Sequence, residues 1–313
     1  MSVLEPIVCS DFYKLCLEVC GQARLPMHNF YRSKKTYNNF VHVFLLTYKE
    51  RLNVSYRRFI EIAEENNLQR MLCIKRIPHF TTIQKALQRL PKSLLERMVR
   101  ACKKLLNLKN IEASVDGTGF SNTNPSQYYT DRIDAKTVKN YTKTVFLTDN
   151  KTKLILNIRT HSDRTNETID FIPLVKELKN TLSTILADKG YDSTKNRKYC
   201  WDNNIENHIP LREWKQNRKN YGHKPHYNKQ RKKASKLFNQ TKYHNRALIE
   251  SVNSAIKRTL GGWVCSRKPE NQQKQATIKA LAYNLEHIGR TIKIKLFINT
   301  QGILQSQRRE NLY

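Results

Sequence analysis

The chain has 313 residues, and its 57 lysines and arginines against 26 aspartates and glutamates give a formal net charge of +31. A charge this positive excludes most ordinary soluble enzymes, and a sequence pI near 10.0 indicates an acidic polymer, foremost a nucleic acid, as the partner. At roughly 150 residues per domain, the length predicts about two folding units. No apolar run reaches the roughly 18 residues that a membrane-spanning helix needs, so a transmembrane role is excluded.

The cysteines and the first residues bear on the cellular compartment. The seven cysteines form an odd-numbered set without a C-x-x-C pair, which is typical of reduced, mostly buried thiols. The first twenty residues contain Glu5, Asp11 and Glu18 and lack the pattern of a secretion signal, so a cytoplasmic location is expected. His223 and His226 have no cysteine or carboxylate at zinc-site spacing beside them, so phosphate contact or solvent exposure is expected there.

The first part of the chain has helical periodicity. Between residues 39 and 108 the apolar residues recur at helical spacing, and turn signals fall between the periodic stretches. Helices are expected over about residues 41–52, after the N-cap Ser55, after Asn67 and from Ser93. Residues 1–109 are therefore predicted to form an all-helical region.

The segment from residue 81 to 90 predicts an amphipathic helix, with an apolar face that includes Ile83 and Leu87. Thr81 or Thr82 is expected to cap it, and Pro91 to end it. With the short helix before it, this segment is compatible with a helix-turn-helix whose second helix enters a DNA major groove. A solvated helix surface fits the pattern equally well. The side chains expected to face DNA are Gln84, Lys85, Gln88 and Arg89.

After Asn110 the pattern changes to short strands. Residues 111–115, 142–148 and 154–160 predict a three-stranded antiparallel meander, and residues 182–187 predict a fourth strand. The helix between the third and fourth strands is expected to be capped by Asp163 or Thr165 and to bury Ile169, Ile172, Leu174, Val175 and Leu178. A helix from about Ser193 and a short strand near residues 208–211 follow. This order predicts an α/β fold with helices covering a mixed sheet, over residues 110–313.

Residues 214–242 differ in composition from the rest of this second part. They include ten Lys or Arg, no Asp or Glu, and four aromatic residues. Basic side chains interleaved with rings suit a nucleic-acid backbone and exposed bases, although a flexible solvated loop fits as well. A long helix over residues 243–260, closed by Gly261 and Gly262, and an amphipathic helix over residues 276–292 are expected beyond it.

Three acidic residues are placed where this arrangement brings them together. Asp116 ends the first strand, Asp188 ends the fourth, and Glu250 belongs to the helix over residues 243–260. An aspartate at a strand end is more often a turn-former or cap, and a lone helical glutamate is more often a solvated charge. The small residues 117–119 after Asp116, however, allow a backbone or a metal-bound phosphate to approach closely. Asp192 or Ser193 is expected to cap the next helix.

Four side chains share one face of the helix that carries Glu250. Tyr243, Arg246, Glu250 and Lys257 fall within an arc of roughly 60° at about 100° per residue. Tyr243 and Lys257 lie about 10 Å to either side of Glu250, too far to share one metal centre with it. We therefore expect Glu250 to ligate a metal while its neighbours bind DNA phosphates.

The spacing Tyr-x2-Arg-x3-Glu-x6-Lys, together with the segments DGTGF and ADKGYD and residues 209–212, resembles the insertion-sequence transposases with a ribonuclease H-like DDE domain. The resemblance spans about residues 111–290. It implies a ribonuclease H-like mixed sheet preceded by a helical, helix-turn-helix-like DNA-binding region. It also implies that Asp116, Asp188 and Glu250 are catalytic, that Arg246 supports Glu250 or a phosphate, and that Tyr243 and Lys257 hold the transposon end.

The negative charge of three neighbouring carboxylates indicates which cofactor such a site needs. Three carboxylates within a few ångströms repel one another unless divalent cations neutralise them. Oxygen ligands favour Mg²⁺, with Mn²⁺ as a substitute, and two ions about 3.5 to 4 Å apart activate the attacking oxygen and stabilise the leaving one. In the family, water frees a 3′-hydroxyl at the element's end, and that hydroxyl then attacks target DNA.

The resemblance further implies partners and a location. The partners are double-stranded DNA, at the terminal inverted repeats of the element and at the target, and a second copy of the chain in the active complex. A cytoplasmic, nucleoid-associated protein of a prokaryotic host is expected. Two alternatives stay open: a DNA-binding regulator without catalysis, which the charge alone supports, and a cellular ribonuclease H-like nuclease. Terminal repeats around the reading frame would distinguish the transposase from both.

Overall fold

The computed structural model describes residues 4–29, 32, 35–122, 141–162, 165–212 and 229–310. The first part of the chain is helical, as its periodicity predicted, up to a change to strands after Asn110. Its helices are α1 (Leu4–Gln22), α2 (Asn39–Leu52), α3 (Tyr56–Glu65), α4 (Leu68–Met71), α5 (Phe80–Arg89) and α6 (Lys92–Leu105). The later helices are α8 (Phe171–Lys176), α9 (Thr194–Asp202), α10 (Lys229–Leu237), α11 (Gln240–His244), α12 (Ala247–Leu260) and α13 (Pro269–Glu310), with short 3₁₀ helices η1 (Glu167–Asp170) and η2 (Lys189–Tyr191).

Five strands form one mixed sheet in the order β3-β2-β1-β4-β5. Strands β1 and β2 pair antiparallel, as do β2 and β3, whereas β4 runs parallel to both β1 and β5. The strands are β1 (Ile111–Ser121), β2 (Tyr141–Asp149), β3 (Ile155–His161), β4 (Leu182–Ala187) and β5 (Glu206–His208). The predicted antiparallel meander and the mixed α/β class are confirmed, and the order is consistent with a ribonuclease H-like sheet.

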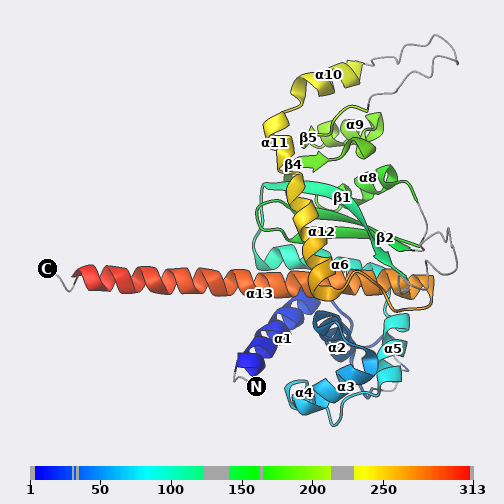
Figure 1. The fold of residues 1–313 in the computed structure, drawn as a ribbon, viewed down its shortest axis with the longest axis vertical. Coiled ribbons are helices and arrows are strands. Elements are labelled where there is room, and N and C mark those ends of the chain that lie inside the picture. The colour runs from blue at the N-terminus through cyan, green and yellow to red at the C-terminus, as the bar shows by residue number, and fades with distance from the viewer. Residues whose placement is uncertain are drawn as a thin grey trace, which may run out of the picture.

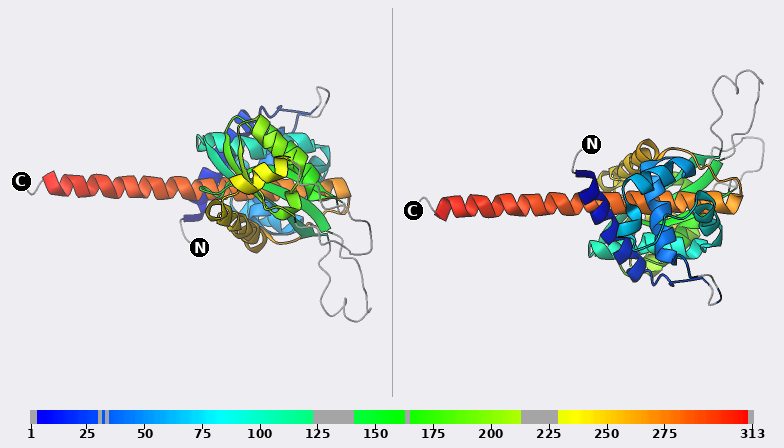
Figure 2. Two further views of the ribbon diagram at one scale, coloured as in Figure 1. Left: turned by 90° about the horizontal axis from the view of Figure 1, so that it is seen from above. Right: turned by 90° about the horizontal axis from the view of Figure 1, so that it is seen from below.

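Helix α13 crosses the molecule between its two parts. Figure 1 shows α1 to α5 on one side of α13 and the sheet on the other, and both views of Figure 2 show α13 running through the body and projecting beyond it at its C-terminal end. Helices α6, α12 and α13 all contact strands of the sheet, and α13 also contacts α1, α2 and α5. Its predicted apolar stripe is buried, and the buried apolar side chains form one continuous core from α1 to α13.

Caps explain where several of the helices begin. The Asn38 side chain accepts a hydrogen bond from the Val41 amide before α2, and the predicted N-cap Ser55 accepts one from Arg58 before α3. The prediction that Thr81 or Thr82 caps α5 is wrong. That helix begins at Phe80, after His79, whose φ of −55° and ψ of 147° are not helical. Helix α1, which the sequence did not predict, precedes them.

The connection between β3 and β4 also differs from its prediction. It begins with η1, capped by the Asn166 side chain rather than by Thr165, and Asp163 lies outside the described residues. Because a 3₁₀ helix has three residues per turn, the face that points inward shifts. Ile169 is consequently 60% exposed, and Phe171 is buried with Leu174.

Two other sequence predictions concern the burial of the cysteine thiols and the hydropathy of the helices. Four of the six cysteines whose side chains the structure describes are buried, and all six are free thiols. The exposed ones are Cys73 and Cys265. Within the described ranges, none of the helices combines the length and apolar character that a bilayer-spanning segment needs. His223 and His226 lie outside the described residues.

A buried ion cluster joins α2 to α13. The Glu50 carboxylate lies 2.9 Å from the Nζ atoms of both Lys49 and Lys279, and it accepts a hydrogen bond of 2.9 Å from Gln275 Nε2. Lys279 also donates to the carbonyl oxygen of Leu260, the last residue of α12. Burial alone raises the pKa of Glu50, but the two ammonium groups outweigh this effect and hold the pKa below its usual value. The cluster therefore links three helices from both parts of the chain.

We expect Glu50→Gln to lower the free energy of unfolding by about 3 to 5 kcal/mol, because it leaves two buried ammonium groups without their carboxylate. Since the pKa of Glu50 is depressed in the folded state, the stability that this carboxylate contributes is present above its unfolded pKa and is lost as pH falls through its folded pKa. Urea unfolding at pH 7 and pH 4 measures both effects.

The matched control is Glu61→Gln, which removes an ion pair with Arg58 whose side chains are more than half exposed. It should change the free energy of unfolding by less than about 1 kcal/mol. Equal losses for the two variants would show that the buried cluster does not stabilise the fold.

Candidate active site

The sheet brings Asp116 and Asp188 to neighbouring strands. In the parallel pairing of β1 with β4, Val115 lies opposite Ala187, so the next residues, Asp116 and Asp188, stand side by side along the two chains. Asp188 follows the last residue of β4, as predicted, and its Oδ1 accepts a hydrogen bond of 2.7 Å from the Lys189 amide at the start of η2. The parallel register therefore gathers two carboxylates that are far apart in the sequence.

Strand β1 does not end at Asp116, contrary to the sequence prediction. It continues to Ser121, because residues 117–121 pair with β2 without interruption. The close approach of a backbone or a metal-bound phosphate to the small residues after Asp116 stays a prediction, and in this structure side chains lie over Gly117 and Gly119. The carboxylate of Glu167 fills the space over Gly117, and the ring of Tyr141 fills the space over Gly119.

Glu250 lies in the first turn of α12, where the positive end of the helix dipole stabilises a carboxylate. The predicted single helix over residues 243–260 is interrupted. Tyr243 belongs to α11, and α12 begins only after Arg246. Between them, the backbone amides of Asn245 and Arg246 bond to carbonyls three residues earlier, and the Asn245 side chain binds Glu112 at 3.0 Å. Tyr243 and Glu250 therefore do not share one α-helical face.

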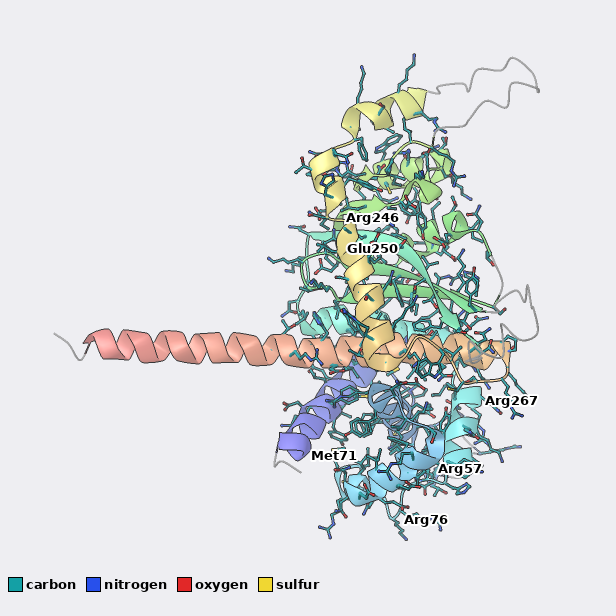
Figure 3. All side chains as sticks on the ribbon, in the orientation of Figure 1. Arg57, Met71, Arg76, Arg246, Glu250 and Arg267 are labelled. Atoms are coloured by element: carbon teal, nitrogen blue, oxygen red, sulfur yellow. The ribbon has the colours of Figure 1, made fainter. Side chains whose placement is uncertain are left out.

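Arg246 connects Glu250 to Asp116. Its Nη1 lies 2.9 Å from Glu250 Oε1, and its Nη2 lies 3.3 Å from Asp116 Oδ1. The second oxygen of Asp116 accepts a hydrogen bond of 3.1 Å from Asn253 Nδ2, one turn further along α12. Figure 3 labels Arg246 and Glu250 where α12 passes the sheet. One guanidinium thus holds the start of α12 against the middle of β1.

The charges at this site act on one another. Burial raises the pKa of Asp116, Arg246 opposes that rise, and the carboxylates of Glu167 and Glu250 add to it. Burial alone would lower the pKa of Arg246, but the surrounding acidic groups, Asp116 first and Asp188 and Glu250 among them, outweigh it and raise that pKa. The three predicted carboxylates therefore all lie in the electrostatic field of one guanidinium.

Glu167 is a fourth carboxylate at the site, and the sequence analysis missed it. It lies 3.2 Å from Lys143 Nζ and accepts a hydrogen bond of 2.9 Å from the Tyr191 hydroxyl, three residues after Asp188. Burial, followed by Glu167, raises the pKa of Tyr191. Glu167 thus links β1, β2 and η2. Gly117 is the one sequence signal that points to this arrangement, because a side chain there would occupy the place of the carboxylate.

The other predicted residues occupy three separate places. Lys257 is exposed on α12, nearly two turns beyond Glu250. The predicted DNA-facing residues Gln84, Lys85, Gln88 and Arg89 are exposed on α5, across α13 from the sheet. Asp192 does not cap α9 as expected. Its side chain instead pairs with Arg197 at 3.0 Å and with Arg231 at 2.9 Å.

The carboxylates do not converge as tightly as a loaded metal centre would require. In the part of the chain that the structure describes, no three His, Cys, Asp or Glu side chains are grouped closely enough to hold a metal ion. The Arg246 guanidinium instead lies between Asp116 and Glu250 and binds both. The arrangement is thus a charge-compensated cluster of oxygen donors.

Comparisons with known proteins show the family of the chain. Residues 109–285, more than half of the chain, match the family described as the transposase DDE domain, and the chain belongs to that family. Among solved structures, a piggyBac transposase synaptic complex with hairpin DNA matches with a TM-score of 0.45 at 13% identity, over 93% of this chain and 76% of that one. No curated protein matches the sequence.

The contact between Gly117 and Glu167 can be tested by substitution. In Gly117→Ala the new Cβ would overlap Glu167 Oε1, so we expect a loss of about 1 to 3 kcal/mol in the free energy of unfolding. Combining it with Glu167→Ala should recover part of that loss, as a double-mutant cycle by urea unfolding would show. The control Gly190→Ala, at the same end of the sheet, has nothing within 4 Å of its new Cβ and should change stability by less than about 0.5 kcal/mol. If the loss of unfolding free energy in the double variant equals the sum of the losses in the two single variants, the contact is contradicted.

Proposed function

We propose that this protein is the transposase of an insertion sequence, which cleaves DNA at the ends of its element and joins the freed 3′-hydroxyls to target DNA. The observation that carries this proposal is the meeting of Asp116 and Asp188 on neighbouring parallel strands, with Glu250 attached to Asp116 through Arg246. Membership of the transposase DDE family supports it. We further propose residues 1–109 as the DNA-binding region and residues 110–313 as the catalytic domain.

The donor set fits a divalent cation of the magnesium type. Asp116, Asp188 and Glu250 offer oxygen ligands only, which Mg²⁺ prefers and Mn²⁺ also accepts. Arg246 now supplies the positive charge that offsets Asp116 and Glu250, and its buried Nε has no hydrogen-bond partner among the described residues. We propose that these three carboxylates hold two Mg²⁺ ions and that Arg246 leaves Asp116 when the ions bind. The ions would activate the attacking oxygen and stabilise the leaving one.

The proposed reaction has two steps, each of which replaces one P–O bond by another. Water attacks the phosphorus at the element's end, the P–O3′ bond breaks, and the leaving O3′ takes up a proton to become a hydroxyl. The oxygen of that hydroxyl then attacks a phosphodiester of the target and forms a new P–O bond, while the target's own P–O3′ bond breaks and its O3′ leaves as a hydroxyl with the proton that the attacking hydroxyl gives up. The protein itself forms no covalent intermediate. Asn253 and Lys189 support the proposal by orienting two of the carboxylates, since the Asn253 amide binds Asp116 and the Lys189 backbone amide binds Asp188.

Contacts to DNA are proposed for residues around this cluster. Tyr243 and Lys257 lie before and after Glu250 in the chain, and Arg246, once released from Asp116, can bind a phosphate. Residues Gln84, Lys85, Gln88 and Arg89 of α5 present an exposed polar face for double-stranded DNA. Since two element ends must be joined in one reaction, we propose that a homodimer binds the two terminal inverted repeats.

Substitution of the three carboxylates tests the catalytic assignment. Asp116→Asn, Asp188→Asn and Glu250→Gln should each slow cleavage of a duplex carrying the element's terminal sequence by at least about a hundredfold in Mg²⁺. We expect Mn²⁺ to raise the melting temperature of the wild-type protein, because a bound ion stabilises only the state that binds it, and we expect each variant to lose this rise. The matched control is Asp202→Asn, at an exposed position, which should keep both the cleavage rate and the effect of Mn²⁺ on the melting temperature. The assignment is wrong if all three variants still cut.

Lys257 allows DNA binding to be separated from catalysis. Lys257→Ala should weaken binding of the same duplex and reduce the slope of log K against log salt by about one, because one phosphate contact is lost. Asp188→Asn should bind the duplex at least as well as the wild type, since it removes a negative charge. Fluorescence anisotropy at several salt concentrations measures both, and an equal loss of binding for the two variants would contradict these roles.

A further inference from the structure

A groove of about 850 Å³ lies between the two parts of the molecule. One wall comes from α2, α3 and α5, and the other from the segment after α12 and the first turns of α13. Residues from both walls line it, among them Arg57, Gln84, Gln88, Trp263, Arg267 and Lys268. Figure 3 labels Arg57 and Arg267 on the same side of the molecule. The groove is separate from the carboxylate cluster.

The groove is strongly positive. Five basic side chains and one carboxylate are found among the described residues that line it. Arg57, Arg267 and Lys268 are exposed, and the floor contains the buried cluster in which two lysines share the single carboxylate of Glu50. A buried excess of one positive charge beneath a basic rim favours an anionic ligand. An acidic polymer with regularly spaced charges fits a groove better than a small anion does.

The remaining lining residues match the chemistry of DNA. Trp263 is 37% exposed, and the Arg57 guanidinium lies over the Phe80 ring at 5.3 Å. Gln84 and Gln88 present amides that can bind phosphates or base edges, and they come from the helix whose sequence predicted a DNA-facing surface. That surface therefore forms one wall of a site whose other wall belongs to the catalytic part.

The lengths of β1 and α12 give two independent estimates of the distance between the groove and the carboxylates. Along β1, Asp116 is five residues from Ser121, which pairs with Trp263, so the separation is about 17 Å. Along α12, Glu250 is ten residues from Leu260, which Lys279 holds, so the separation is about 15 Å. B-form DNA rises about 3.4 Å per base pair. A duplex whose reacting phosphate lies at the carboxylates would therefore reach the groove after about five base pairs.

Hydrogen bonds connect the groove to the helix that carries Glu250. The Gln275 side-chain oxygen accepts bonds from the amides of Cys265 and Ser266, at 3.0 and 3.1 Å, and the same side chain donates to Glu50. Lys279 holds the carbonyl end of α12. A ligand in the groove thus contacts a rigid frame that extends to the carboxylates.

We propose that this groove binds the duplex DNA that flanks the reacting phosphate, with both parts of the chain contacting the same duplex. The proposal rests on the proposed function for its substrate. It adds the location: Arg57 from α3 and Arg267 and Lys268 from the segment before α13 bind phosphates, and Gln84 and Gln88 face the duplex from α5.

The double variant Arg57→Glu/Arg267→Glu tests the proposal. Its affinity for a fluorescein-labelled 30-base-pair duplex of arbitrary sequence should fall at least tenfold at 100 mM salt, and its salt slope should fall by about two, because two phosphate contacts are lost. The matched control is Lys109→Glu/Lys151→Glu, which makes the same change in net charge at exposed positions. Lys109 precedes β1, whose length separates it from the Trp263 end of that strand by about 33 Å. The control should bind within threefold of the wild type.

A second readout reports on the groove itself. In a Trp201→Phe/Trp214→Phe background, Trp263 is the remaining tryptophan of the chain. Its emission should change when the duplex binds. Equal loss of affinity in the two double variants, or unchanged Trp263 emission at saturating duplex, would overturn the proposal. Neither measurement uses cleavage. Failure of the carboxylate variants to stop cutting would overturn the proposed function alone, and normal binding by Arg57→Glu/Arg267→Glu would overturn the groove alone.

Discussion

The repulsion between carboxylates is the constraint on which the rest of this structure depends. Asp116, Asp188, Glu250 and Glu167 are brought toward one end of a sheet, where burial raises the pKa of Asp116. Two cations offset the repulsion: Arg246, which binds both Asp116 and Glu250, and Lys143, which binds Glu167. The parallel register of β1 with β4 and the start of α12 at residue 247 are the features that deliver these groups to one place.

The same compensation allows these carboxylates to lie close together in the folded chain without a metal ion. A guanidinium between two carboxylates stabilises the cluster and leaves oxygen ligands nearby for ions that bring more charge. The buried Glu50 cluster has a parallel role at the other end of α12, where Lys279 binds both Glu50 and the Leu260 carbonyl. Helix α12 is therefore fixed at both ends by buried or half-buried charges. In our account, DNA held in the groove and the reacting phosphate contact one rigid frame.

Much of the fold could be predicted because local patterns decide it. Alternating and helical periodicity identified the four main strands and most helices, and Gly261, with a φ of 82°, ends α12 as its sequence suggested. Asp116 and Asp188 could be paired because each comes directly after a run of buried strand residues, although β1 itself continues beyond Asp116. Arg246 could be placed near Glu250 because residues four apart are neighbours on a helix, and this relation survives even though the helix begins only at residue 247.

The remaining features depend on contacts that no local pattern contains. The break between α11 and α12 involves Asn245 binding Glu112, a residue 133 positions earlier in the chain. Strand β1 continues past Asp116 because β2 pairs with its glycines, although glycine disfavours strands by itself. Glu167 reaches the site through a 3₁₀ turn whose start the sequence misplaced. In each case a tertiary contact overrides the local preference.

The central claim is that Asp116, Asp188 and Glu250 form one metal site whose charge Arg246 compensates until the ions bind. A crystal structure of the protein grown with Mn²⁺, with the ion located by its anomalous scattering, tests this most directly. The account predicts Mn²⁺ bound to oxygens of Asp116 and Asp188, with Glu250 nearby and the Arg246 guanidinium withdrawn from Asp116. Mn²⁺ bound elsewhere, with Arg246 still bridging Asp116 and Glu250, would contradict it.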